Sequence, residues 1–169
     1  ETARMNHENW VRSVAFSPDG LYLATGSGYT ARIWESGTGR ETARMNHENW
    51  VSSVAFSPDG LYLATGSRDS TARIWEARTG RETARMNHED AVTSVAFSPD
   101  GLYLATGSRD STARIWEART GRETARMNHE NIVSSVAFSP DGLYLATGGD
   151  NTARIWEART GRETARMNH

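Results

Sequence analysis

Apolar and polar residues alternate along short stretches of this chain, and turn residues separate the stretches. From Leu61 to Ser67, positions 61, 63, 65 and 67 fall on one face and positions 62, 64 and 66 on the other, which is the period of a β-strand. Pro58-Asp59-Gly60 fits the tight turn before this stretch, because proline fixes φ and glycine accepts a positive φ. This section of the chain therefore predicts four strands, at Val51–Ser57, Leu61–Ser67, Thr71–Glu76 and Glu82–Met86.

The fourth predicted strand differs from the other three because it is short and polar. Such a strand suits the outer edge of a sheet, where charged side chains discourage pairing with other molecules. The inner strands carry apolar groups on both faces, so the sheet has to be covered on both sides. Stacking of similar sheets around an axis provides that cover. We therefore expect an all-β fold of four-stranded antiparallel sheets.

The same section recurs along the whole chain every 40 or 41 residues, which indicates a repeat architecture. The string Glu-Thr-Ala-Arg-Met-Asn-His opens each copy and returns a fifth time at Glu163. Four copies of Ser-Val-Ala-Phe-Ser-Pro-Asp-Gly-Leu-Tyr-Leu-Ala-Thr-Gly lie between these strings, and Thr-Ala-Arg-Ile-Trp-Glu follows each copy. The expected units are residues 1–40, 41–81, 82–122 and 123–162, with 163–169 as an extra edge strand that completes the last unit.

These motifs resemble those of the WD-repeat (WD40) β-propeller family over essentially the whole chain. Four motifs match in fixed order: the family's Gly-His at Asn46-His47, its Ser-Pro-Asp-Gly turn at Ser57–Gly60, its Ser-x-Asp-x-Thr at Ser67–Thr71 and its Trp-Asp at Trp75-Glu76. Asn replaces Gly and Glu replaces Asp in the two namesake dipeptides, while the His and the Trp are kept. The resemblance implies a β-propeller with four blades in this chain.

The resemblance also implies a structural role for His, Ser, Asp and Trp side chains that recur once per blade. In the family these side chains form a hydrogen-bonded tetrad, and such a network fixes one arrangement when every member is bonded. Repeats 1 and 4 are one residue shorter in the turn between the second and third strands, so blade 1 lacks the Asp and blade 4 the Ser. The expected tetrads are His47, Ser67, Asp69 and Trp75; His88, Ser108, Asp110 and Trp116; His7, Ser27 and Trp34; and His129, Asp150 and Trp156.

Ser, His and Asp are also the ingredients of a hydrolase triad. A nucleophile needs one activated site, whereas a structural device is needed in every blade, so the repetition favours the structural role. We therefore expect no catalytic residue and no enzyme activity. The five histidines lie about 40 residues apart rather than at ligand spacing, and cysteine is absent, so we expect no metal site and no cofactor.

Composition limits the possible partners. A formal net charge of −2 excludes a strongly basic nucleic-acid binder. All 19 cationic residues are arginines, and they alternate with acidic residues, as on a solvated outer surface. No apolar run approaches the roughly 20 residues of a membrane span, and no signal peptide precedes Glu1. We therefore expect a soluble, cytoplasmic protein that binds neither nucleic acid nor membranes.

The copies differ mainly at two positions after the tetrad His, on either side of a constant valine. Strand alternation directs this valine into the core and its two neighbours towards the mouth of the ring. In the family, these positions and the residue before the tetrad Asp line the top face, which binds partners. Trp and Arg are enriched at interface hot spots, although neutral drift at tolerant positions is an alternative. The expected binding residues are Trp10, Arg12, Trp50, Ser52, Arg68, Ala91, Thr93, Arg109, Ile132 and Ser134.

Two hypotheses for function remain. The first is a non-catalytic propeller scaffold that presents a variable top face to a protein or peptide. The alternative is a designed or excerpted repeat array that assembles into a propeller and has no evolved ligand, which the near-identity of the copies favours.

Four blades leave an open arc with two uncovered apolar faces, which a soluble monomer rarely tolerates. We therefore expect a homodimer in which two chains close an eight-bladed ring, a longer array being the alternative. Glu163–Met167 of one chain and Glu1–Met5 of the other then compete for one edge position, as in domain swapping.

Overall fold

The structure is a computed structural model that describes residues 3–149 and 151–168. These residues form four sheets of four antiparallel strands, and each sheet is one blade. The strands of blades 1 and 2 are β1 (Val11–Phe16), β2 (Tyr22–Ser27), β3 (Thr30–Glu35), β4 (Glu41–Asn46), β5 (Val51–Phe56), β6 (Tyr62–Ser67), β7 (Thr71–Glu76) and β8 (Glu82–Asn87). Those of blades 3 and 4 are β9 (Val92–Phe97), β10 (Tyr103–Ser108), β11 (Thr112–Glu117), β12 (Glu123–Asn128), β13 (Ser135–Phe138), β14 (Tyr144–Gly149), β15 (Thr152–Glu157) and β16 (Glu163–Asn168). Within the described ranges, no helix has the length and apolar character needed to cross a membrane.

The strands follow chain order in every blade, as the turn chemistry predicts. The turn between β5 and β6 is closed by Asp59, whose Oδ1 accepts hydrogen bonds from Ser57 Oγ and from the Leu61 N–H at 3.0 Å. Gly60 in the same turn has a φ of 73°, a conformation that glycine adopts at little cost. The predicted strands of the second repeat are confirmed to within one residue at each end.

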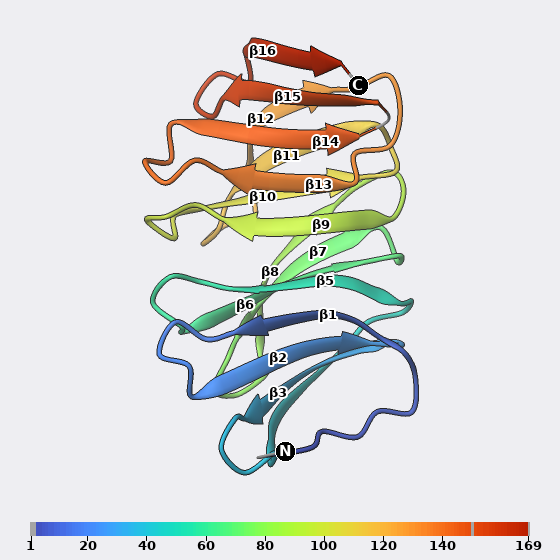
Figure 1. The fold of residues 1–169 in the computed structure, drawn as a ribbon, viewed down its shortest axis with the longest axis vertical. Helices are drawn as coiled ribbons and strands as arrows, with labels where there is room; N and C mark the ends of the chain where they lie inside the picture. Colours follow the sequence, from blue (N-terminus) through green and yellow to red (C-terminus); the bar gives the residue numbers. More distant parts are fainter. Residues whose placement is uncertain (1–2, 150, 169) are drawn as a thin grey trace.

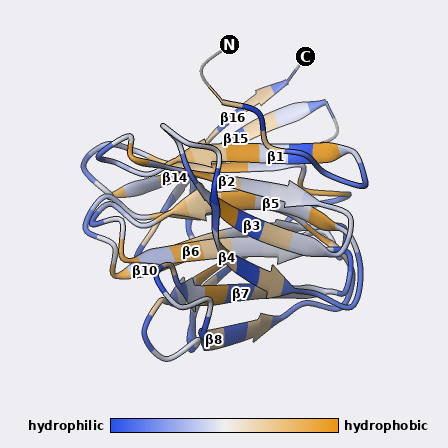
Figure 2. Cartoon of the chain, turned by 90° about the horizontal axis from the view of Figure 1, so that it is seen from below, coloured by the Kyte–Doolittle hydropathy of each residue, from blue (hydrophilic) through white to orange (hydrophobic). Residues whose placement is uncertain are grey.

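The four blades form an arc. In Figure 1 the first strands of the blades, β1, β5, β9 and β13, lie one above another in the middle of the view. Blade 1 extends downward from this row and blade 4 extends upward, in the opposite direction. Figure 2, turned so that the arc is seen from below, shows apolar and polar positions alternating along the strands. The blades thus fan out around one line of inner strands and leave one side of the arc open.

The core lies between blades and has two different halves. We call the face that each blade turns towards the preceding blade its leading face, and the face towards the following blade its trailing face. One buried cluster joins blades 1 and 2, and the same cluster recurs between blades 2 and 3 and between blades 3 and 4. In the first cluster the trailing face of blade 1 contributes Ala24, Ala31, Ile33, Ala43 and Met45, and the leading face of blade 2 contributes Val51, Val54, Leu63 and Trp75.

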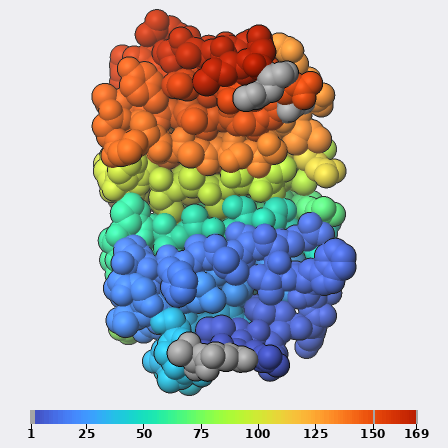
Figure 3. Space-filling model, viewed as in Figure 1, coloured from blue at the N-terminus to red at the C-terminus, as the bar shows by residue number. Residues whose placement is uncertain are grey.

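Two such faces remain uncovered in the described part of the chain. Val11 on the leading face of blade 1 is 44% exposed, whereas its counterpart Val51 is 0% exposed. Met167 on the trailing face of blade 4 is 43% exposed, whereas Met45 is 1% exposed. Figure 3 shows these two ends of the stack, blade 1 in blue and blade 4 in red. One chain therefore carries one unpaired copy of each half of its own core interface.

The two terminal copies of the edge sequence have different structures. Glu163–Asn168 forms β16, the outer strand of blade 4. Residues 3–5, the described part of the N-terminal copy, lie in no strand. The carbonyl of Arg4 lies 3.2 Å from the ideal Cβ position of Gly39, and Arg44 of β4 has the same relation to Gly80 in blade 2. The N-terminal segment thus occupies the place that the outer strand of a preceding blade would take.

Candidate functional site

A hydrogen-bonded network connects three parts of blade 2. His47 follows β4, Thr65 lies in β6 and Trp75 in β7. His47 Nδ1 lies 2.8 Å from Asp69 Oδ2, and His47 Nε2 lies 2.7 Å from Thr65 Oγ1. Trp75 Nε1 donates to the same Oγ1 at 2.9 Å. Because Asp69 accepts, His47 carries its proton on Nδ1, and the Thr65 hydroxyl donates to Nε2. Every polar atom of the His47, Thr65 and Trp75 side chains then has a partner.

The expected tetrad member Ser67 bonds neither His47 nor Trp75, and Thr65 takes its place in this link. Ser67 Oγ donates to the carbonyl of Asn49 at 3.1 Å and accepts from the Asp69 N–H at 3.1 Å. Ser67 thus holds the loop that carries Asp69. The same correction applies in blades 3 and 1. The tryptophan there donates to Thr106 or Thr25, whereas Ser108 and Ser27 donate to backbone carbonyls.

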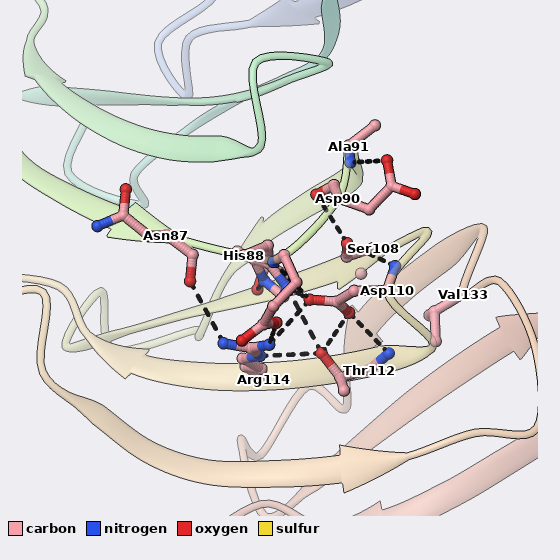
Figure 4. Close-up of polar contacts among 12 residues, drawn as sticks. Asn87, His88, Asp90, Ala91, Ser108, Asp110, Thr112, Arg114 and Val133 are labelled. Atoms are coloured by element: carbon pink, nitrogen blue, oxygen red, sulfur yellow. Dashed lines mark hydrogen bonds and ion pairs between the residues drawn. The ribbon is translucent and has the colours of Figure 1, made fainter.

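Blade 3 repeats the network and adds an arginine that sequence analysis missed (Figure 4). His88 bonds Asp110 Oδ2 at 2.7 Å and Thr106 Oγ1 at 2.7 Å. Arg114, 2% exposed, bonds Asp110 Oδ2 at 2.8 Å through Nη2 and the carbonyl of Asn87 at 3.3 Å through Nη1. Arg73 has the same contacts in blade 2. The recurrence of Thr-Ala-Arg-Ile-Trp in every copy was the available signal for this buried cation.

The network controls the ionisation of its members. Burial of Asp69 opposes its charged form, but hydrogen bonds from His47, Thr71 and the Glu48 N–H hold the pKa of its carboxyl well below the usual value. The pKa of the Asp110 carboxyl is lowered by equivalent bonds from Thr112, the Glu89 N–H and His88. Burial lowers the pKa of His88, although its bond to Asp110 works in the opposite direction. A neutral histidine beside a charged aspartate therefore stands at the centre of blade 3.

Blade 1 contains an incomplete version of the network, and blade 4 contains its threonine link. In blade 1 the two-residue turn at Gly28 and Tyr29 leaves no Asp, and neither of the two buried ring nitrogens of the half-buried His7 has a hydrogen-bond partner. His7 still packs edge-on against Trp34, with ring centroids 5.2 Å apart. In blade 4, Thr147 joins His129 Nε2 at 3.0 Å and Trp156 Nε1 at 2.7 Å, while Asp150 lies outside the described residues. The short turn of blade 1 thus leaves His7 without the two hydrogen bonds that His47 makes.

The hydrogen bonds at these sites connect a loop to two strands of the same blade. The nearest approach to a triad lacks a serine beside the imidazole, because the partner is a threonine whose hydroxyl also binds Trp75. Ligand atoms of His47, Glu48 and Asp69 lie within 4.8 Å of one another, close enough for a metal ion. Arg73, however, pairs through Nη2 with both Glu48 and Asp69. A guanidinium therefore supplies the positive charge that an ion would bring.

A second site lies at the mouth of the arc, where six of the ten expected binding residues surround one pocket. Its volume is about 310 Å³. A β-bulge in the first strand of each of blades 1 to 3 brings one of these residues to the pocket, because the extra residue is displaced from the regular alternation. The bulge residues are Arg12, Ser52 and Thr93, and the other lining residues are Arg68, Ala91 and Arg109.

The remaining four expected binding residues do not line this pocket. Trp50 is half-buried, and the guanidinium of Arg12 lies 4.6 Å from its ring centroid. Trp10 projects into solvent with 80% of its surface exposed. Ile132 and Ser134 precede the shorter strand β13 and are exposed. The pocket at the mouth of the arc is therefore formed by blades 1 to 3, and Trp50 packs against its lining residue Arg12.

The repeated motifs were compared with known proteins. The family model described as WD domain, G-beta repeat (WD40) matches residues 2–35, 39–76, 80–117 and 121–157. The chain belongs to the WD-repeat family. No curated protein matches the chain as a whole.

Membership of the WD-repeat family agrees with the all-β fold and with four blades. WD-repeat chains form propeller scaffolds for protein interactions, and the family is generally non-catalytic. Trp75, from the dipeptide that matches the family's Trp-Asp, is buried and donates to Thr65. His47, from the dipeptide that matches the family's Gly-His, accepts from the same threonine. The two residues that identify the family are thus the two ends of one hydrogen-bonded link.

Proposed function

We propose that this chain is a non-catalytic binding scaffold that works as half of an eight-bladed ring. Two copies associate head to tail, and the mouth of the ring binds a protein or a peptide through its variable residues. The family supports the role of interaction scaffold. The observation that carries the proposal is that the two uncovered faces of one chain are the two halves of its internal interface.

The uncovered faces match the buried ones residue for residue. Val11 and Val14 repeat Val51 and Val54, which are buried between blades 1 and 2. Burying apolar surface at about 25 cal/mol per Å² favours association of two such faces. Blades 1 and 4 extend in opposite directions in Figure 1, so a two-fold axis on the open side could join both pairs of faces at once.

A row of glycines makes the fit between blades specific. A Cβ on Gly66 would lie 2.8 Å from Val92 Cγ1 in the next blade, so the valine fills the space that the glycine leaves. Gly26 and Val51 have the same relation. A Cβ on Gly148, at the same place in blade 4, would lie 3.8 Å from the Cβ of Ser135, an ordinary contact. In the proposed ring this empty notch would receive Val11 of the second copy.

Closure of the ring would displace one terminal segment. Residues 3–5 of one copy and β16 of the other would need the same place beside Gly39 of blade 1. β16 is already paired with β15, so it would keep this place and release the N-terminal segment. The reverse exchange, in which residues 3–5 replace β16 of the partner copy, would be a domain swap.

Gly148→Val tests the assembly, because it fills the notch without touching the interior of one chain. We expect wild type to sediment as a species of twice the 18.7 kDa mass of one chain, and the variant to sediment as a folded single chain. Gly66→Val is the matched control: it introduces the same side chain within the chain and should destabilise the fold itself. A variant that keeps the two-chain mass, or a wild type that is a soluble monomer or an open polymer, contradicts the proposal.

A designed or excerpted repeat array without an evolved ligand is the second candidate, and the near-identity of the four copies favours it. The two candidates differ at the mouth of the ring. A screen of peptides against the assembled ring and against a ring with serine at all ten variable positions separates them. Binding that depends on the variable residues supports the first, and equal binding to both rings supports the second.

A further inference from the structure

The pocket at the mouth of the arc gathers positive charge that its own lining residues do not neutralise. Most arginines pair with a neighbouring carboxylate, as Arg85 does with Glu82 at 2.8 Å. Among the described residues, the guanidinium groups of Arg12, Arg68 and Arg109 form no ion pair. They come from blades 1, 2 and 3 and line the same pocket of about 310 Å³. The carboxylates of Glu48 and Glu89 pair with Arg73 and Arg114, which do not line the pocket.

The structure also orients these three arginines. The backbone N–H of Arg68 donates to the carbonyl of Trp50 at 2.8 Å, and that of Arg109 donates to the carbonyl of Ala91 at 2.9 Å. Arg12 lies over the ring of Trp50, a cation–π contact that joins blades 1 and 2. The backbones of two of the arginines and the side chain of the third are therefore fixed before any ligand binds, which reduces the entropic cost of binding.

Hydroxyl and apolar groups complete the pocket. The Thr93 hydroxyl is engaged with the carbonyls of Gly107 at 2.9 Å and Val133. Ser52 also lines the pocket, and its hydroxyl can donate to a bound oxygen. The pocket has no carboxylate in its lining. Planar guanidinium groups around a small space match the oxygens of a carboxylate or a phosphate, which they bind through paired hydrogen bonds.

We propose that this arginine pocket, made of Arg12, Ser52, Arg68, Ala91, Thr93 and Arg109, binds an anionic side chain of a peptide segment. The anion is a carboxylate or a phosphate ester. The proposal rests on the proposed function, because it names the partner of the same top face. Among the described residues, blades 1 to 3 form this pocket once per chain, so a two-chain ring binds two anions.

A peptide fits these observations better than a nucleic acid. Binding of nucleic acid depends on a stripe of cations that follows several phosphates. Here three unpaired cations meet at one small pocket, and the outer strands carry Arg and Glu in bonded pairs such as Arg126 and Glu123. The net charge of −2 also repels a polyanion. One anionic group carried by an otherwise uncharged segment avoids this repulsion.

Three small probes test the pocket on the assembled 169-residue protein. N-acetylphosphoserine amide supplies a phosphate, N-acetylglutamate amide a carboxylate, and N-acetylglutamine amide the neutral shape. We expect one or both anionic probes to shift the Nε–Hε NMR signals of the pocket arginines, and the neutral probe to leave them unchanged. Which anion binds more tightly identifies the source of the charge.

Matched variants separate the pocket from general charge. Arg68→Gln combined with Arg109→Gln removes two pocket cations, and Arg78→Gln combined with Arg119→Gln removes two cations from turns at the other edge of the same two blades. We expect the first pair to weaken anion binding about tenfold or more and the second to leave it unchanged. Equal losses in both pairs, or equal binding of the neutral probe, overturn the inference. Light scattering on the same samples measures the mass and so tests the two-chain ring separately from the pocket. A two-chain ring that does not bind the anionic probes refutes the pocket but not the ring.

Discussion

Thr65→Val removes one hydroxyl from the centre of blade 2 and keeps the shape of the side chain. Thr65 is fully buried, and its Oγ1 donates to His47 Nε2 and accepts from Trp75 Nε1. The substitution leaves both of these buried nitrogens without a partner, at a cost of about 1 to 3 kcal/mol each. We therefore expect Thr65→Val to lower the free energy of unfolding by about 2 to 6 kcal/mol.

Blade 1 offers a matched control for this prediction. Thr25 accepts from Trp34 Nε1 at 2.9 Å, whereas His7 has no hydrogen bond to lose. Thr25→Val therefore strands one nitrogen rather than two, and we expect about half the loss. Guanidinium unfolding followed by tryptophan fluorescence measures both, at one fixed chain concentration because association adds to apparent stability. A loss below about 0.5 kcal/mol for Thr65→Val, or equal losses for the two variants, refutes the role assigned to the threonine hydroxyl.

Three further predictions concern pH, the tryptophans and the short turn. Burial lowers the pKa of His88 below its usual 6.5, and hydrogen bonds outweigh burial in lowering the pKa of Asp110. The unfolded chain therefore binds more protons than the folded chain as pH falls, and the free energy of unfolding should drop below about pH 6.5 and again below about pH 4. A free energy of unfolding that rises between about pH 7.5 and 5 contradicts this prediction. Trp10→Ala should change stability by less than about 0.5 kcal/mol because Trp10 is exposed, whereas Trp75→Ala should cost about 3 to 5 kcal/mol; similar costs in denaturant unfolding would invalidate the placement of the two rings. Insertion of Asp between Gly28 and Tyr29 should give His7 its missing partner and stabilise the chain by about 1 kcal/mol, which thermal unfolding checks; an inserted chain that melts no higher than wild type removes the basis for this prediction.

The fold could be read from the sequence because pattern, turn chemistry and repetition all agree. Period-two alternation locates the strands, Pro-Asp-Gly fixes the hairpins, and the recurrence at fixed spacing gives the number of sheets. The polar fourth strand is correctly identified as an outer edge, where Glu82 and Arg85 form a pair in solvent. These features depend on residues close together in the chain, which one sequence contains in full.

The tetrad hydroxyl could not be assigned in the same way. Thr65 and Ser67 lie on the same face of β6, two residues apart, so alternation cannot choose between them. The choice depends on the register of β6 against β7, in which Leu63 pairs with Trp75 and Thr65 with Arg73. The indole of Trp75 therefore reaches Thr65 rather than Ser67. Register is a property of the packed sheet.

The top face was located in the sequence from variable residues, but the pocket depends on geometry between blades. Arg12, Ser52 and Thr93 share a β-bulge, and a bulge adds one residue that no repeat count reveals. The contact of Arg12 with Trp50 likewise joins two repeats. The sequence indicated which residues vary, while the three-dimensional arrangement determines which of them meet.

Engineered disulfides test the closed two-chain ring most directly. The ideal Cβ of Gly66 lies 3.4 Å from Val92 Cβ, close to the separation of about 3.5 to 4.5 Å in disulfides. Val11→Cys with Gly148→Cys should reproduce this geometry between two chains, in a protein that has no other cysteine. Gly66→Cys with Val92→Cys is the control that closes within one chain.

The ring predicts that mild oxidation converts the Val11→Cys, Gly148→Cys variant into one covalent species of two chains on a non-reducing gel, while each single variant stays uncrosslinked. A product that remains a single chain, or a ladder of ever longer polymers, would contradict the ring.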